Sequence, residues 1–175
     1  MNEVLEAMKN RRSLRKFKPN MVEQDKIDQI IEAGLYAASG MNRQETKIIA
    51  IKNKDFRDKL SAVNAKIMGQ PEGTDPFYGA PVVLIVLANK NCSTGIYDGS
   101  LVMGNLMLAA HALGISSCWI HRAKEEFDMP EYKGWLKSLG IDGEWEGIGH
   151  CILGYADSAE PSAPARKENR VYYID

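Results

Sequence analysis

A short segment near the N-terminus carries three arginines and a serine at close spacing: Arg11, Arg12, Ser13 and Arg15. A guanidinium group binds phosphate oxygens in pairs through its parallel N–H donors, and a serine hydroxyl adds one more donor. This pattern therefore suits a phosphate monoester, which carries about two negative charges. The same residues also fit a basic surface that only water contacts, and the segment alone does not decide between the two.

The charge balance of the whole chain sets this segment apart. The 175 residues contain 22 Lys and Arg against 23 Asp and Glu, a net charge of −1. Residues 9–18 hold six of those cations and no acid, so the rest of the chain has 16 bases against 23 acids and a net charge of −7. Because an acidic body repels a polyanion, the sequence argues against a nucleic-acid partner and favours a small anion at residues 9–18.

The sequence offers few other groups that could do chemistry. Its three cysteines have no CxxC spacing, and its three histidines have no HExxH or HxH spacing. The phosphate-binding patterns GxGxxG and GxxxxGK[ST] are missing, as is the GxSxG of serine hydrolases. We therefore expect no bound metal, although the sequence leaves a Cys–His nucleophile pair open.

Hydrophobic periodicity predicts the elements that must position the basic segment. Val4, Leu5 and Met8 form one face of an opening helix. The other predicted helices cover 22–37, 54–65, 97–113 and 132–139, and the predicted strands cover 47–52, 82–88, 116–120 and 148–153. The run at 82–88 has no polar alternation, which predicts a central strand covered on both faces.

Two segments look unusual for a chain that acts alone. The helix at 97–113 is apolar nearly all round, which predicts burial in a core or an interface. Residues 156–170 read as an extended tail that ends in the apolar stretch 171–174, and such an end indicates docking, for example on a second subunit.

Composition predicts a single domain over residues 1–175. The chain is 45% hydrophobic and 26% charged, as in ordinary globular proteins. No stretch reaches about 18 uninterrupted apolar residues, so we expect no membrane segment. The cysteine usage fits a reducing compartment, and we expect a cytoplasmic protein.

Taken together and in order, several segments resemble the nitroreductase family of flavin enzymes. The matching segments are Arg11–Phe17, Ala38–Gln44, Leu106–Ile120, Gly149–Tyr155 and Pro164–Lys167. The resemblance implies an α+β fold with a mixed central sheet flanked by helices. It also implies an intertwined homodimer with one FMN in each of two sites at the subunit interface.

The resemblance also assigns roles to particular residues. Arg11, Arg12, Ser13 and Arg15 are similar to the ligands of the FMN phosphate and ribityl chain, with Arg166 and Lys167 adding cations from the tail. The loop that the partner subunit lays against the flavin is matched by Ala38, Ser39, Gly40, Met41 and Asn42. The family commonly has Pro at the position of Ala38, a departure that affects loop stiffness.

Two further matches concern the flavin ring. Asn64 matches a polar flavin contact. Ile120, His121 and Arg122 correspond to the segment whose backbone N–H groups lie against the N5 edge of the flavin.

The implied activity is hydride transfer from NADH or NADPH to FMN, followed by reduction of a nitroaromatic, a quinone or a similar small molecule in ping-pong turnover. A cation such as Arg15 would stabilise the reduced flavin. The short stretch between Cys118 and Gly147 predicts an open, accommodating pocket. The alternatives are a flavin enzyme of the same fold with another reaction (dehalogenation, azoline oxidation or flavin destruction) and a flavin-binding protein without turnover.

Overall fold

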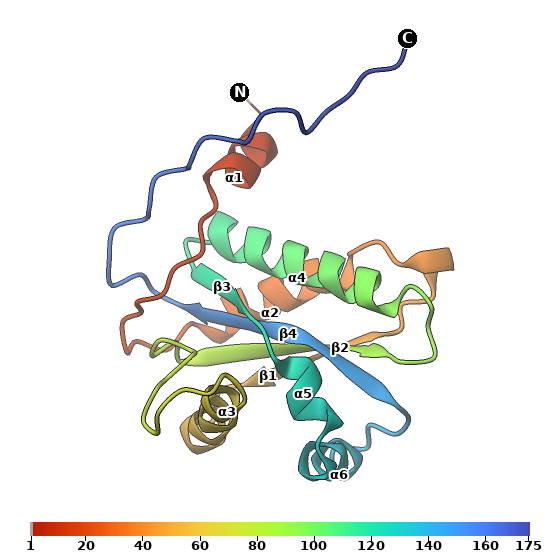
Figure 1. Cartoon of the computed structure of the whole chain (residues 1–175). Coiled ribbons are helices and arrows are strands. Elements are labelled where there is room, and N and C mark those ends of the chain that lie inside the picture. Colours follow the sequence, from red (N-terminus) through yellow and green to blue (C-terminus); the bar gives the residue numbers. More distant parts are fainter. Residues whose placement is uncertain (1) are drawn as a thin grey trace.

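The computed structural model describes residues 2–175, and a four-stranded sheet lies at its centre (Figure 1). The strands are β1 (Thr46–Ile51), β2 (Val82–Asn89), β3 (Ser116–Ile120) and β4 (Trp145–Gly154). Their order in the sheet is β1-β2-β4-β3, and each neighbouring pair is antiparallel. β2 is thus a central strand, and all but its last residue are buried, as the apolar run at 82–88 predicts.

Helices cover both faces of the sheet, and the alternation of β2 divides the interior into two cores. Leu84 and Val86 point to the core formed with α2 (Gln24–Leu35) and α4 (Gly95–Ala112). Val83 and Ile85 point to the opposite core, which α3 (Lys54–Ile67), α5 (Ala123–Asp128) and α6 (Pro130–Ser138) complete. Figure 1 shows this arrangement, with α2 and α4 on one side of the sheet and α3, α5 and α6 on the other.

The α+β class is confirmed, and the predicted helices and strands lie within a few residues of the observed ones. Among residues 2–175, all neighbouring strands of the sheet are antiparallel, and the parallel pairing is an isolated bridge between Ser13 and Ser117 outside the named strands. Sequence analysis missed α5 altogether, since a six-residue helix is too short to show a helical period.

The long helix α4 is only half covered by its own chain. Val102, Met103 and Leu106 face the core, whereas Ile96, Tyr97 and Leu101 are 51–72% exposed. The opening helix α1 (Glu3–Asn10) contains no buried residue. One face of the helix predicted at 97–113 is thus buried in the core, and burial of its other face in an interface stays a prediction.

The tail leaves the body of the molecule in extended form (Figure 1). It starts beside the basic segment, where Phe17 pairs with Ala156 and the Asp157 amide donates to the Lys16 carbonyl over 3.1 Å. Its apolar end, residues 171–174, is 68–99% exposed. Docking of this end on a second subunit stays a prediction.

Across residues 2–175, no helix has both the length and the apolar character needed to cross a membrane.

Candidate functional site

The basic segment follows α1 and lies against the outer edge of β3. Ser13 pairs with Ser117, and the Leu14 amide donates to the Ser117 carbonyl over 3.1 Å. The side chains of Leu14 and Phe17 are buried in the core and fix the segment in place. An apolar residue on each side of Arg15 thus anchors the backbone from which the polar side chains project.

The arginines of this segment carry donors that the protein does not use. Arg12 Nη1 donates to the carbonyls of Lys9 and Arg11 over 2.7 and 2.6 Å. Arg12 Nε and Arg11 Nη1 are buried, yet they have no hydrogen-bond partner among the described residues. Arg15 is exposed. Because buried polar groups in proteins are normally paired, these donors fit an anion bound beside them.

The opposite end of β3 leads into the Ile120–Arg122 segment. Ile120 is buried, and Arg122 adopts a left-handed conformation with φ 76° and ψ 6° before α5 begins. Within residues 2–175, the amides of His121 and Arg122 donate to no other backbone group. The basic segment and these two free amides therefore lie at the two ends of one strand edge.

Asn64 is on α3, and its side chain contacts the Ile120–Arg122 segment from within the core. It is fully buried in α3, and its Nδ2 donates to the His121 carbonyl over 3.0 Å and to Glu126 Oε1 over 2.7 Å. Its Oδ1 accepts a hydrogen bond of 2.9 Å from Arg122 Nε. The Asn64 side chain thus contacts the Ile120–Arg122 segment and Glu126. A direct contact between Asn64 and a cofactor stays a prediction.

Two residues that sequence analysis did not single out for the site extend this arrangement. Glu126 on α5 and His150 on β4 are fully buried, and Glu126 Oε2 lies 2.7 Å from His150 Nε2. This is a close polar contact outside hydrogen-bond geometry, and neither atom has another partner in the described chain. No sequence signal could have found the pair, since 24 residues and a whole helix separate its members.

The Ala38–Asn42 loop includes a short 3-10 helix, η1 (Gly40–Asn42), and is held by the start of α4. The Gly40 amide donates to the buried Asp98 Oδ1 over 3.0 Å, and the Gln44 amide donates to Ser39 Oγ over 3.1 Å. Met41 is 83% exposed at positive φ. In Figure 1 this loop and the basic segment lie on opposite sides of the molecule, so a single chain does not bring the two together.

Both tail cations are exposed to solvent. The Arg166 guanidinium donates to the Pro164 carbonyl within the tail itself, and Lys167 stands beside it in the chain. Their predicted role stays a prediction.

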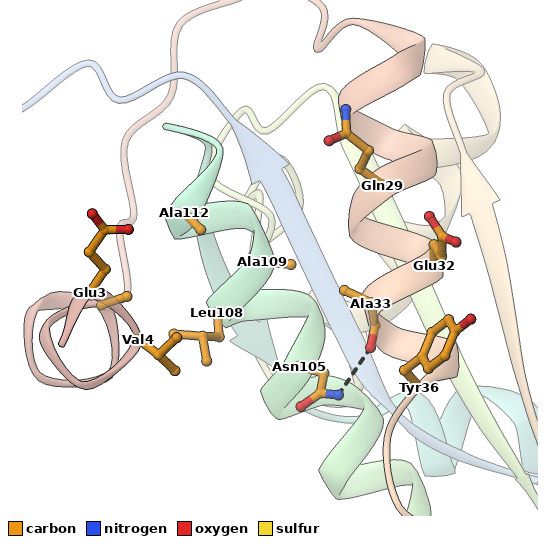
Figure 2. Close-up of a pocket in the computed structure, with 11 residues that line it drawn as sticks. Glu3, Val4, Gln29, Glu32, Ala33, Tyr36, Asn105, Leu108, Ala109 and Ala112 are labelled. Atoms are coloured by element: carbon orange, nitrogen blue, oxygen red, sulfur yellow. Dashed lines mark hydrogen bonds between the residues drawn. The ribbon is translucent and has the colours of Figure 1, made fainter.

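A separate apolar groove of about 750 Å³ opens between α1, α2 and α4 (Figure 2). Its lining residues are Glu3, Val4, Ala7, Gln29, Glu32, Ala33, Tyr36, Asn105, Leu108, Ala109 and Ala112. Asn105 spans the helix pair by donating to the Ala33 carbonyl over 3.0 Å. Tyr97, Leu101 and Leu108 follow each other at helical spacing, so the groove continues the exposed apolar face of α4.

The cysteines give little support to a Cys–His nucleophile. All three are free and buried. Burial strongly raises the pKa of the Cys151 thiol, which keeps it neutral, whereas the Thr94 hydroxyl lowers the pKa of Cys92. A buried neutral thiol is a poor nucleophile, which argues against Cys151 in that role.

Comparison with known proteins agrees with this description. A protein of Methanothermobacter thermautotrophicus with the provisional name NADH dehydrogenase/NAD(P)H nitroreductase is 31% identical over 143 residues, covering 74% of this chain and 71% of that one. The FMN reductase (NAD(P)H) of Bacillus subtilis is 27% identical over 170 residues, covering 81% of this chain and 66% of that one. Among solved structures, a nitroreductase with bound FMN from Bacteroides fragilis is 30% identical with a TM-score of 0.90, and each chain is covered in full.

The same assignment comes from the family as a whole. Residues 8–155 match the sequence model of the Nitroreductase family, a span that begins just before the basic segment and ends just after β4. The chain belongs to the nitroreductase family.

Proposed function

We propose that the protein is an FMN-dependent oxidoreductase that takes hydride from NADH or NADPH and reduces a nitroaromatic, a quinone or a similar small molecule in ping-pong turnover. One observation carries the proposal: Arg11 Nη1 and Arg12 Nε are buried beside the β3 edge without a partner in the described chain. The similar Bacteroides fragilis protein contains FMN, whose phosphate offers the acceptor oxygens that these donors require.

The residues present fit this cofactor at both ends. Arg11, Arg12 and Ser13 would hold the phosphate, and the exposed Arg15 would place a positive charge where reduction adds negative charge. FMN, when bound, supplies the hydride chemistry, because its flavin ring accepts hydride from a nicotinamide and gives it to an acceptor. The free amides of His121 and Arg122 would donate hydrogen bonds to the ring and orient it.

We also propose that the working unit is a homodimer with a site at each interface. The Ala38–Asn42 loop lies across the molecule from the basic segment, so the two can meet only if different chains supply them. The exposed face of α4, the groove of Figure 2 and the apolar end of the tail offer surface for such a partner. Burial of these side chains would contribute about 25 cal/mol per Å² of apolar area.

A visible spectrum of the purified protein, followed by anaerobic titration with NADH and NADPH, tests the activity. We expect a yellow protein whose flavin absorbance is bleached by at least one of the two nucleotides and returns when a nitroaromatic or a quinone is added. A colourless protein that takes up no added FMN refutes the proposal. Bound FMN that neither nucleotide reduces would instead support a flavin protein of the same fold with another reaction or none.

A steady-state survey of acceptors tests the open pocket. In the described chain, the connection between β3 and β4 contains two short helices, α5 with six residues and α6 with nine, and no helix longer than these. We therefore expect turnover with both nitroaromatics and quinones. Turnover of one acceptor class alone would contradict an accommodating pocket.

A further inference from the structure

The His121–Arg122 backbone is held in a costly conformation. Arg122 has a φ of 76°, and a side chain with a Cβ atom crowds the following carbonyl in this left-handed region. Such residues persist only where the surrounding structure imposes them, and they cluster at functional sites. The contacts around Arg122 identify the groups that impose its left-handed conformation.

Asn64 binds both residues of the turn at once. Its Nδ2 donates to the His121 carbonyl over 3.0 Å, and its Oδ1 accepts from Arg122 Nε over 2.9 Å. The second Nδ2 proton goes to Glu126 Oε1 over 2.7 Å. Because a carbonyl oxygen only accepts and a guanidinium N–H only donates, the two contacts with the turn fix which end of the Asn64 amide is the nitrogen, and Glu126 adds a third hydrogen bond to that nitrogen.

Glu126 in turn contacts the central sheet. Its other oxygen lies 2.7 Å from His150 Nε2, and both side chains are fully buried. The His150 ring packs on Phe77, with 5.2 Å between the ring centroids. His150 stands on β4, an interior strand of the sheet, so the contacts run from the sheet to the loop at the end of β3.

We infer that Asn64, held by Glu126 and His150, is a positioning residue that aims the backbone amides of His121 and Arg122 at the flavin ring. The inference rests on the proposed function, which assigns those amides to the flavin. It differs from a role in general packing because, in the described chain, each side-chain hydrogen bond of Asn64 ends on this turn or on Glu126. None of the three side chains need touch the cofactor.

A matched control lies one turn earlier on the same helix. Ser61 is buried, and its hydroxyl donates to Asp75 Oδ1 over 2.5 Å, away from the His121–Arg122 turn. Ser61→Ala and Asn64→Ala therefore each remove buried hydrogen bonds from α3, but only the second change reaches the turn. Glu126→Gln is the conservative variant, since it keeps an oxygen that can accept from Asn64.

The first measurement uses amide hydrogen exchange in the FMN-free protein. For the amide at position 126, which donates to the Arg122 carbonyl over 3.2 Å, we expect exchange to quicken about tenfold or more in Asn64→Ala, because the turn that carries this carbonyl loses its hydrogen bonds to Asn64. Ser61→Ala should leave this amide at the wild-type rate, and Glu126→Gln should fall between the two. Equal rates of this amide in Asn64→Ala and Ser61→Ala would overturn the inference, whether or not the protein binds flavin.

The second measurement uses the FMN-loaded protein and separates this inference from the proposed function. We expect Asn64→Ala to shift the midpoint potential of the flavin while its Kd for FMN changes less than in Arg11→Ala, because the phosphate contacts are untouched. An unchanged potential in Asn64→Ala refutes the inference and leaves FMN binding intact. A wild-type protein that binds no FMN fails the proposed function instead, and the inference falls with it.

Discussion

At the scale of single residues, the cations of the basic segment divide by what they contact. Arg11 and Arg12 keep buried donors without partners in the described chain, whereas Lys16 faces Asp157 at 3.4 Å on the surface and Lys18 is exposed. Exposed ion pairs contribute little to stability, which is consistent with the proposed role of this segment in binding.

This division predicts the behaviour of two double variants. Arg11→Ala with Arg15→Ala should weaken FMN binding roughly 100-fold or more, because each lost charge-assisted hydrogen bond costs about 1.5–3 kcal/mol. Lys9→Ala with Lys18→Ala removes the same charge and should change the FMN Kd by less than about threefold. Fluorescence titration measures both, and circular dichroism should show an unchanged fold. Retention of stoichiometric FMN in the arginine variant would refute the phosphate assignment.

A second residue-scale prediction concerns the loop that precedes β2. Arg57 is buried and donates to Asp75 Oδ2 over 2.6 Å and to the Ala80 carbonyl over 3.1 Å. Partial burial acts to raise the pKa of Asp75, but hydrogen bonds from Arg57, Ser61 and the Gly79 amide outweigh it and hold that pKa below its ordinary value. The ionised carboxylate is therefore the form that stabilises the fold.

Asp75→Asn should lower the free energy of unfolding by about 1–3 kcal/mol at pH 7, since it removes one of the two carboxylates that pair with the buried Arg57 and leaves Asp58 as the other. A lowered pKa in the folded state contributes stability above the unfolded value of about 3.9 and loses it as the pH falls through the folded value. The gap between wild type and variant should thus narrow below about pH 4. Urea unfolding from pH 7 to pH 3 measures it, and a gap that does not change with pH would contradict the assignment.

At this scale, sequence reasoning can detect a pattern whose residues are neighbours in the chain, and it misses a group of residues that only the fold brings together. Arg11, Arg12, Ser13 and Arg15 stand within five residues, so their pattern is visible in the chain. Glu126 and His150 acquire meaning only when α5 folds back on β4, and nothing in either local sequence indicates that contact. Asn64 was found by resemblance, but its contacts with the turn needed the structure.

At the scale of elements, the first turn of α4 holds the Ala38–Asn42 loop, and the apolar residues of the helix pack in the core. Asp98 in that turn accepts from the Gly40 amide over 3.0 Å and from Thr94 Oγ1 over 2.9 Å. A Cβ atom on Gly40 would lie 2.4 Å from Thr94 Oγ1, so the loop approaches the helix closely. The helix end therefore sets the position of the Ala38–Asn42 loop.

Asp98→Ala should release this loop without unfolding the sheet, because the contact that it removes joins the loop to the helix. We expect FMN affinity to fall about tenfold, since the proposed site includes the loop, while Asp98→Asn keeps an oxygen acceptor and most of the affinity. Proteolysis near residues 39–44 and FMN titration measure the two effects. Equal affinity in the Ala variant and the wild type would show that the loop does not contribute to binding.

The elements themselves were the most predictable level of structure. The apolar run of β2 and the helical periods of α2, α3 and α4 can be read from neighbouring residues of the sequence. The structure confirms these elements. The strand order β1-β2-β4-β3 was not predictable, because pairing depends on contacts between residues far apart in the chain.

At the scale of the whole molecule, one chain leaves several apolar surfaces uncovered. The exposed side chains of α4, the groove between α1, α2 and α4, and the apolar tail end are all features that monomeric proteins rarely keep uncovered together. They fit the proposed dimer, in which the tail of one chain extends over the other.

Removal of residues 158–175 tests this arrangement, because it leaves the Asp157–Lys16 backbone bond and the whole sheet in place. The truncated chain should fold with wild-type secondary structure but form a weaker dimer. Burying each large apolar side chain is worth about 1.5–3 kcal/mol, so the dimer dissociation constant should rise at least roughly tenfold. Tyr172→Ser with Tyr173→Ser keeps the length of the tail and should show most of the same effect if the apolar end is what binds. Sedimentation velocity over a range of protein concentrations measures the dimer affinity of both variants. Equal dimer affinity in the truncated and full chains would mean that the tail has no part in assembly. A full chain that stays monomeric at every concentration would contradict the dimer itself.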